Sequence, residues 1–307
     1  MRPPGGDGGT DVAYVMVAVN LLLFMLLAPF YEGIVRRVTA RVQSRQGPPL
    51  LQPYFDLLKL LGKERIDAGG TWPFRFAPLV ALGAMLVVVA IVPAAGRATA
   101  LTGRGDLITL VYLLTLSGVA VLMGGFASRN AYAAIGASRE MVTMILIEPV
   151  LVMMLLTGGI RHGSLDLSTL VGGGAAWAWS TVIMALVSLV ALQAFVARQP
   201  FDIAEAEIEI LDGPCIEYSG PDLALLKYAR MLKQMFYAYF LVAVFVPLTG
   251  LVMVDLPLQL AAVGVISVAV ALVGATNPRF RIDQAVRFYA VLLVISLGAI
   301  GLSLGGY

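Results

Sequence analysis

The chain has 307 residues, of which 59% are hydrophobic and only 13% are charged, and its mean hydropathy is +0.88. Soluble domains carry about 25% charged residues, so the composition excludes an ordinary water-soluble domain. The net charge is +2, and the chain has one cysteine, Cys215, and one histidine, His162. These counts exclude an internal disulfide, an iron–sulfur cluster and bis-histidine haem ligation by this chain alone.

Apolar runs of about 20 residues, the length that crosses a ~30 Å hydrocarbon core, recur along the whole sequence. They predict an all-α membrane protein, a polytopic bundle of about eight transmembrane helices in a single integral domain, residues 1–307. The first apolar run is expected to be retained, because no small-residue cleavage pattern follows it. The expected spans are 12–37, 74–93, 106–127, 132–158, 176–197, 223–252, 257–276 and 284–304.

Lysine and arginine are distributed unevenly between the two sets of alternating connections. Of the 21 Lys and Arg residues, 17 fall on one side of this arrangement and 4 on the other. Cytoplasmic loops of membrane proteins are enriched in these residues. The pattern therefore predicts a multi-pass protein of the cytoplasmic (inner) membrane with both termini on the outer side.

The connection after the first span is too long for a simple turn. Within it, residues 53–64 repeat apolar side chains at helical spacing against Asp56, Lys59 and Lys63, and Pro53 suits the first turn of a helix. This pattern predicts a short amphipathic helix that lies at the membrane interface.

The fourth span contains two acidic residues, Glu140 and Glu148, which are eight residues or ~12 Å of helix rise apart. A charged side chain near the bilayer centre costs about 2.5–3.5 kcal/mol on insertion scales, so each one requires a reason. Pro149 interrupts the backbone hydrogen bonds beside Glu148. We expect both carboxyls to be stations of an ion path. The alternatives are an ion pair with an arginine for Glu140 and a static interhelical hydrogen bond for Glu148.

The connection from 198 to 222 is the most acidic stretch of the chain. If 202–212 is helical, four of its acids share one sector and Glu207 lies on the other side. Clustered carboxylates raise one another's pKa, which suits proton uptake into a pathway; alternatively, the acidic face docks a basic partner. The four acids in the shared sector are Asp202, Glu205, Glu209 and Asp212, and Glu217 follows them.

Lys227, Arg230 and Lys233 follow at a spacing of three and predict a cationic stripe on the sixth span. The stripe neutralises the acidic connection or binds lipid phosphate, or it takes part in a charge relay. Glu32 is expected to form an i,i+4 ion pair with Arg36, and Cys215 is expected to be a packing residue.

Three blocks of the sequence resemble one known family. The first connection has Arg45-x-Gly47-Pro48 followed by Gln52, Asp56 and Lys59; the second has Arg198-x-Pro200-Phe201-Asp202-x-x-Glu205-x-Glu207, then Gly213 and Glu217-Tyr218-Ser219-Gly220; the fourth span has Gly136 and Arg139 before Glu148. These blocks resemble the eight-helix membrane subunit shared by respiratory complex I (NADH dehydrogenase subunit 1) and the energy-converting, membrane-bound NiFe hydrogenases, including formate hydrogenlyase.

The resemblance implies a non-catalytic membrane subunit that moves protons or sodium and binds no metal or cofactor itself. It implies hydrogenase-like large and small subunits, an iron–sulfur subunit and antiporter-like membrane subunits as partners, which carry the iron–sulfur clusters and the NiFe centre, and contact with lipid but not with nucleic acid. Expected charge partners are Arg139, Arg198, Lys227, Arg230 and Lys233. Expected docking residues are Arg45, Gly47, Pro48, Gln52, Asp56, Lys59, Pro200, Phe201 and Tyr218.

Two segments separate the branches of this family. Complex I members usually have a carboxylate before the tyrosine of the sixth span, whereas this chain has Lys227 before Tyr228. The stretch Leu232-Lys233-Gln234 also looks like the hydrogenase branch. The leading hypothesis is thus a hydrogenase or formate hydrogenlyase subunit. The alternatives are the quinone-chamber subunit of complex I and a stand-alone ion transporter, although the inverted repeats of many transporters are not visible.

Overall fold

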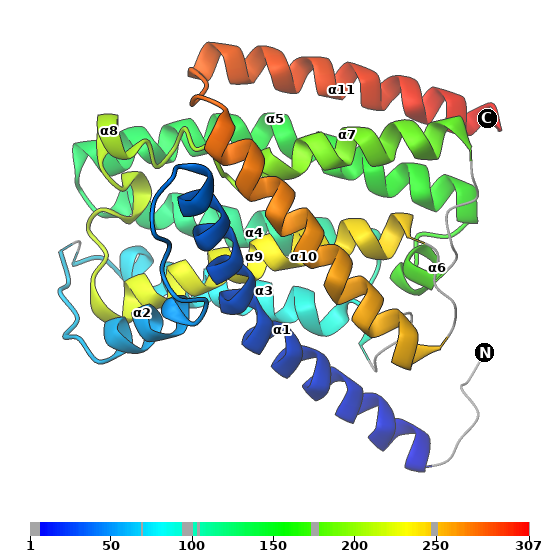
Figure 1. Ribbon diagram of the computed structural model, residues 1–307, viewed down its shortest axis with the longest axis horizontal. Coiled ribbons are helices and arrows are strands. Elements are labelled where there is room, and N and C mark those ends of the chain that lie inside the picture. Colours follow the sequence, from blue (N-terminus) through cyan, green and yellow to red (C-terminus); the bar gives the residue numbers. More distant parts are fainter. Residues whose placement is uncertain are drawn as a thin grey trace.

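The computed structural model describes residues 7–68, 70–93, 101–102, 105–172, 178–246 and 251–306. In this part of the chain the secondary structure is helical and contains no β-strand (Figure 1). The long helices are α1 (Asp7–Val42), α3 (Trp72–Ile91), α4 (Leu107–Ala127), α5 (Ala131–His162), α7 (Trp179–Phe195), α9 (Gly220–Phe245), α10 (Val252–Thr276) and α11 (Ile282–Leu304). The short elements are α2 (Gln52–Leu61), α6 (Leu167–Gly172), α8 (Glu207–Ile210) and the 3₁₀ turn η2 (Gly213–Cys215).

Among the described residues, six helices are long and apolar enough to cross a membrane, namely α1, α3, α4, α5, α10 and α11. α7 is apolar but has only 17 residues. α9 has 26 residues, but residues 227–233 carry the three cations of the predicted stripe. The long helices coincide with the eight expected spans, and the prediction of a polytopic all-α membrane bundle is confirmed.

The boundary between the sixth and seventh predicted spans is wrong. α9 ends at Phe245 rather than at 252, and α10 begins at Val252 rather than at 257. Residues 247–250, which the sixth span was expected to include, lie outside the described residues. Pro257, at which the seventh span was expected to begin, lies inside α10. In a membrane helix, neighbouring groups can satisfy the carbonyl that such a proline leaves free.

The bundle has one end that holds the polar connections. At this end α1, α4, α7 and α10 finish and α3, α5, α9 and α11 begin, and α2 and α8 lie beside them, on the left of Figure 1. We call it the charged end. The start of α1 and the finish of α11 both lie at the opposite end of the bundle.

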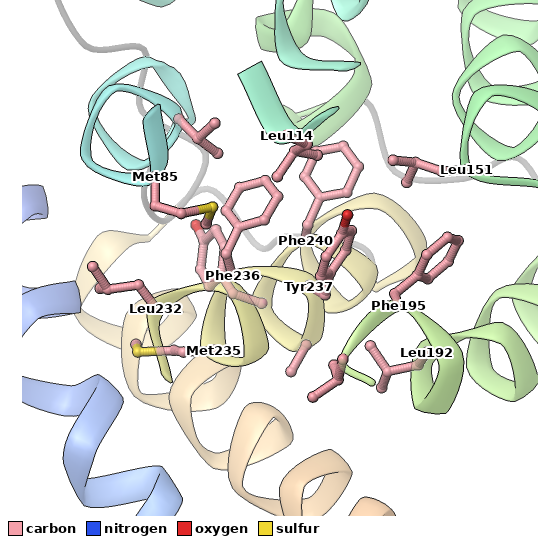
Figure 2. Close-up of a cluster of buried hydrophobic side chains, with 14 of the residues drawn as sticks. Met85, Leu114, Leu151, Leu192, Phe195, Leu232, Met235, Phe236, Tyr237 and Phe240 are labelled. Atoms are coloured by element: carbon pink, nitrogen blue, oxygen red, sulfur yellow. The ribbon is translucent and has the colours of Figure 1, made fainter. Parts of the chain in front are cut away.

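α9 runs through the middle of the bundle. Figure 2 shows its Phe236 and Phe240 side chains facing Met85 of α3 and Leu114 of α4, with Phe195 of α7 on the other side. Phe236 and Phe240 are each 1% exposed or less. Because lipid tails are as apolar as these side chains, the packing is stabilised by close dispersion contacts rather than by transfer from water. The tightly packed second half of α9 fixes the position of its charged first half.

The predicted amphipathic helix is confirmed as α2, which packs against α1 and α9. Its Pro53 is buried, whereas Phe55 and Leu58 are more than half exposed.

On α1, Pro29 has no N–H and therefore leaves the Met25 carbonyl free. The Tyr228 hydroxyl of α9 donates a 2.8 Å hydrogen bond to that carbonyl. α1 is thus fixed at its proline by a side chain of the central helix.

Candidate ion pathway at the charged end

Glu32 lies at the centre of a buried charge network. Its carboxylate is 4% exposed and accepts a 3.0 Å hydrogen bond from Nε of Arg36, one turn later on α1. The other carboxylate oxygen pairs with Arg198, which follows α7. Arg36 also binds Asp56 of α2 at 2.8 Å, and Arg198 donates to the Gln234 side chain of α9 at 2.9 Å. The network therefore ties α1, α2, α9 and the acidic connection together.

The acidic connection does not form the expected helix over 202–212, so the predicted single stripe of acids is wrong. Only Glu207–Ile210 is helical, as α8. Each acid instead has its own surroundings: Asp202 pairs with Arg279 at 3.0 Å, Glu205 pairs with Arg230 of α9, and Glu209 pairs with Arg139 of α5 at 2.6 Å. Separate basic partners remove the repulsion that one shared face would impose.

A glycine of α5 allows the connection to pack directly against the bundle. A Cβ added at Gly136 would lie 2.8 Å from three atoms: the Ala204 carbonyl oxygen, the Gly213 Cα and the Pro214 Cδ. Such distances are well below normal contact, so a larger residue would displace the connection. Gly136 thus sets the depth at which Glu205 and Cys215 are held.

The two inward acids of this connection have raised pKa values. Burial raises the pKa of Asp202, and the guanidinium groups of Arg279 and Arg230 partly offset the effect. Burial likewise raises the pKa of Glu205 to about 7, with Arg230 acting against it and Asp202 adding to it. Glu209 differs, because its side chain is 58% exposed and its hydrogen bond from Arg139 lowers its pKa. A pKa of about 7 allows Glu205 to exchange a proton near neutral pH.

Three cavities adjoin one another at the charged end. Cavity A, about 210 Å³, lies between α1, α10 and the acidic connection. Cavity B, about 300 Å³, lies between α1, α9 and the acidic connection, and cavity C, about 60 Å³, lies against α4 and α5. Arg198 and Asp202 line both A and B, whereas Glu205 and Arg230 line both B and C. Each cavity exceeds the ~15 Å³ that one water needs. The series therefore offers a polar route into the bundle.

Four of the eight predicted pathway acids border this route. Asp202, Glu205 and Asp212 line cavity B together with Lys227, and Glu140 lines cavity C with Lys233. Lys227, Arg230 and Lys233 all face the cavities, so the predicted cationic stripe on α9 lies along the route.

Glu148 lies beyond cavity C on the same helix as Glu140. It is half-buried and lies beside Thr115 of α4, where the charges of Lys233 and Glu140 act on it. The ammonium of Lys233 is 6.0 Å from the centre of the Tyr237 ring. Glu140 and Lys233 thus stand between cavity C and the deeper carboxyl.

Glu209 and Glu217 do not line these cavities. Glu217 accepts a hydrogen bond from the Asn130 side chain that precedes α5, and Glu209 points outward to Arg139. Glu207 begins α8, but its side chain lies outside the described residues. These contacts attach the acidic connection to α5.

The expected docking residues fall into two groups. Pro200, Phe201 and Tyr218 are buried within this chain: the Phe201 ring packs on Phe280 at 5.2 Å, and the Tyr218 hydroxyl donates to the Phe74 carbonyl at 3.0 Å. The other group lies at or near the surface of the charged end and comprises Arg45, Gly47, Pro48, Gln52, Asp56 and Lys59.

Sequence reasoning missed two members of the network. Glu32 was assigned only its pair with Arg36, which is confirmed, but its second partner is 166 residues away. Arg279 was given no role, although it holds Asp202. The one available signal was an acid at the end of an apolar span.

Among the described residues, no three His, Cys, Asp or Glu side chains come together in a way that could hold a metal ion.

Comparisons with known proteins identify the relatives of this chain. Over 235 residues the chain is 36% identical to formate hydrogenlyase subunit 4 of Escherichia coli K12, covering 75% of this chain and 76% of that protein. Over 238 residues it is 34% identical to hydrogenase-4 component C of the same organism, covering 76% and 75%.

The fold also matches one chain in the structure of the membrane-bound sulfane sulfur reductase, an archaeal respiratory membrane complex. The TM-score is 0.86 at 26% sequence identity, over 95% of this chain and 99% of that chain. Residues 14–304 match the family described as NADH dehydrogenase. The resemblance inferred from the three sequence blocks is confirmed, and the chain belongs to the NADH dehydrogenase family.

Proposed function

We propose that the chain is the membrane anchor and ion-translocation subunit of a group 4 membrane-bound NiFe hydrogenase or formate hydrogenlyase complex. In this role it couples electron transfer in the hydrophilic subunits to ion movement across the cytoplasmic membrane, with both termini on the outer side. The observation that carries the proposal is the series of cavities A, B and C, lined by acids and bases, in a chain similar to formate hydrogenlyase subunit 4.

The proposed route runs from cavity A through Asp202 and Glu205 to Glu140 and ends at Glu148. Intramembrane carboxyls that line water-filled cavities are typical of proton relays. Asp202 and Glu205 are each paired with an arginine, which offsets part of the cost of their charges, and Lys233 lines cavity C with Glu140.

The proposed partners are hydrogenase-like large and small subunits, an iron–sulfur subunit and antiporter-like membrane subunits. Those partners carry the NiFe centre and the clusters, and they dock on the surface of the charged end near α2. Affinity purification of the tagged chain from its native membrane tests this. We expect nickel to co-purify at one atom per complex. Iron should co-purify in excess of nickel. A preparation that holds flavin and NADH oxidation activity instead would favour the complex I alternative, and a chain that purifies alone would favour a transporter.

Glu148→Gln in the intact complex tests the route. The amide keeps the size and one acceptor oxygen, has an NH₂ donor in place of the other oxygen, and does not accept a proton at neutral pH. We expect ion translocation to fall at least ten-fold while assembly and electron transfer to an artificial acceptor persist. Asp283→Asn is the matched control, because Asp283 is an exposed acid that pairs only with Arg281 in the described contacts. Translocation at the parental rate in Glu148→Gln would remove Glu148 from the route.

A further inference from the structure

Cavities B and C meet at a single charged contact. The side chains that line both cavities are Ala197, Glu205 and Arg230. Ala197 has no polar group on its side chain, so the polar side chains that the two cavities share are Glu205 and Arg230. They form an ion pair with each other, and their side chains are 22% and 31% exposed. The Glu205–Arg230 pair thus forms the partition within the proposed route.

Basic side chains lie on both faces of the partition, beside the acids that line each cavity. On the side of cavity B, Arg230 is joined by Lys227, and on the side of cavity C it is joined by Lys233. The Arg230 guanidinium also lies 3.5 Å from the Cys215 sulfur. A guanidinium cannot be deprotonated in a protein, so its positive charge is permanent at this point. A metal cation that passed from B to C would meet this fixed charge at contact distance.

The acids around the partition do not form a binding site for a metal cation. Asp202, Asp212 and Glu140 are close enough to act electrostatically on Glu205, yet Asp202 is held by Arg279 and Glu205 by Arg230. Within the described part of the chain, no three such ligands converge. A proton needs no shell of oxygen ligands, because it moves by exchange between a carboxylate and neighbouring water.

We propose that Arg230 is the specificity-determining residue of the route: it excludes sodium and potassium ions and leaves the Glu205 carboxylate as the carrier of protons from cavity B to cavity C. The inference rests on the proposed function. In one passage, a proton from water in cavity B binds to the carboxylate, the ion pair loosens, and the proton then leaves to water in cavity C. Arg230 re-forms the pair with the carboxylate, and no charge other than the proton is displaced.

The titration of Glu205 is compatible with this cycle. Burial holds its pKa at about 7, against the opposing effect of Arg230 and with support from Asp202, Asp212 and Glu140. A carboxyl that titrates near neutral pH both takes up and releases a proton readily.

The first experiment measures passive ion flux through the intact complex in liposomes, without electron donor. Arg230→Gln removes the fixed charge, whereas Arg230→Lys keeps it. We expect the Gln variant to raise ²²Na⁺ flux at least five-fold over the parent and the Lys variant to remain within two-fold of the parent. Equal sodium flux in all three proteins would overturn the role of Arg230 in exclusion.

The second experiment energises the same liposomes with the electron donor of the complex. We expect the parent to build a pH gradient in the absence of sodium. In Glu205→Gln this gradient should be at least ten-fold smaller, while electron transfer to an artificial acceptor persists. Asp283→Asn should keep the parental gradient. A parental gradient in Glu205→Gln would overturn the carrier assignment. The passive-flux comparison of the Arg230 variants decides the question if Glu205→Gln does not assemble.

The outcomes separate this inference from the function on which it rests. A parent that accumulates ²²Na⁺ and needs sodium for its gradient would support ion translocation and overturn proton selectivity at Arg230. A parent that moves no ion at all under turnover would overturn the proposed function itself.

Discussion

Glu32 of α1 and Arg198, 166 residues later in the chain, form an ion pair at the charged end of the bundle. The pair joins the first helix to the start of the acidic connection, and Arg36 binds the same carboxylate from the other side. A carboxylate that is 4% exposed and held by two cations is costly to leave without either partner.

We expect Glu32→Gln to lower the apparent melting temperature of the intact complex. Removing one partner of a buried pair costs about 3–5 kcal/mol. Since both arginines are about one-third exposed, solvent screening reduces the expected loss to about 2–3 kcal/mol. Arg198→Gln and the double variant complete a mutant cycle. Strictly additive effects would contradict the pairing, and Asp283→Asn is the surface control.

The helices and their order were predictable, because long apolar runs bounded by charged or turn-forming residues recur along the sequence. α2 was also predictable from its periodic Leu and Phe residues and Pro53. The sixth and seventh boundaries were not, since a proline begins a helix in one setting and lies inside it in another. Pro257 is of the second kind.

The site was predictable in its composition but not in its pairing. Glu140, Glu205 and Arg230 were all identified from the sequence, and all three line one cavity. The expected helix over 202–212 failed because periodicity carries no information about distant cations. Asp202 turns towards Arg279 and Glu205 towards Arg230, so tertiary ion pairs override the local helical pattern.

We expect Gly136→Ala to expose the single cysteine of the chain. In the parent, Cys215 is 3% exposed, and burial raises its thiol pKa to about 12, so maleimide should label it very slowly at pH 7. The added methyl group would lie 2.8 Å from the Ala204 carbonyl oxygen and displace the acidic connection. Mass spectrometry of the Cys215 peptide should show at least ten-fold faster labelling.

Gly83→Ala is the matched control for this variant. A Cβ at Gly83 would meet no atom within 4 Å, although Gly83 also lies inside a long helix. Labelling should match the parent in this control. If Cys215 stays protected in Gly136→Ala, the close packing of the acidic connection on α5 does not control access to it.

We expect Glu205 to be protonated in part of the molecules at neutral pH. Burial raises its pKa from 4.5 to about 7, so the native state binds a proton that the unfolded chain has released in this range. The contribution of this group to stability therefore falls as pH rises from about 4.5 to about 7. A pH 6 minus pH 8 infrared difference spectrum of the complex should contain a protonated-carboxyl band.

Two variants assign that band. Glu205→Gln should remove it, whereas Glu209→Gln should leave it unchanged, because the hydrogen bond from Arg139 lowers the pKa of Glu209. A band that persists in Glu205→Gln would belong to another carboxyl and would contradict the assignment.

The first connection is fastened to the beginning of α9. The backbone N–H of Ile66 donates to the Ser219 hydroxyl at 3.0 Å, and Arg65 pairs with Asp222 at 2.6 Å. Gly220 has a φ of +53°, and a Cβ there would lie 2.5 Å from the Glu64 carbonyl oxygen. The two connections therefore form one interlocked piece. A chimera that takes one connection from a relative must take the other from the same relative, because otherwise the contacts between the two connections will not form.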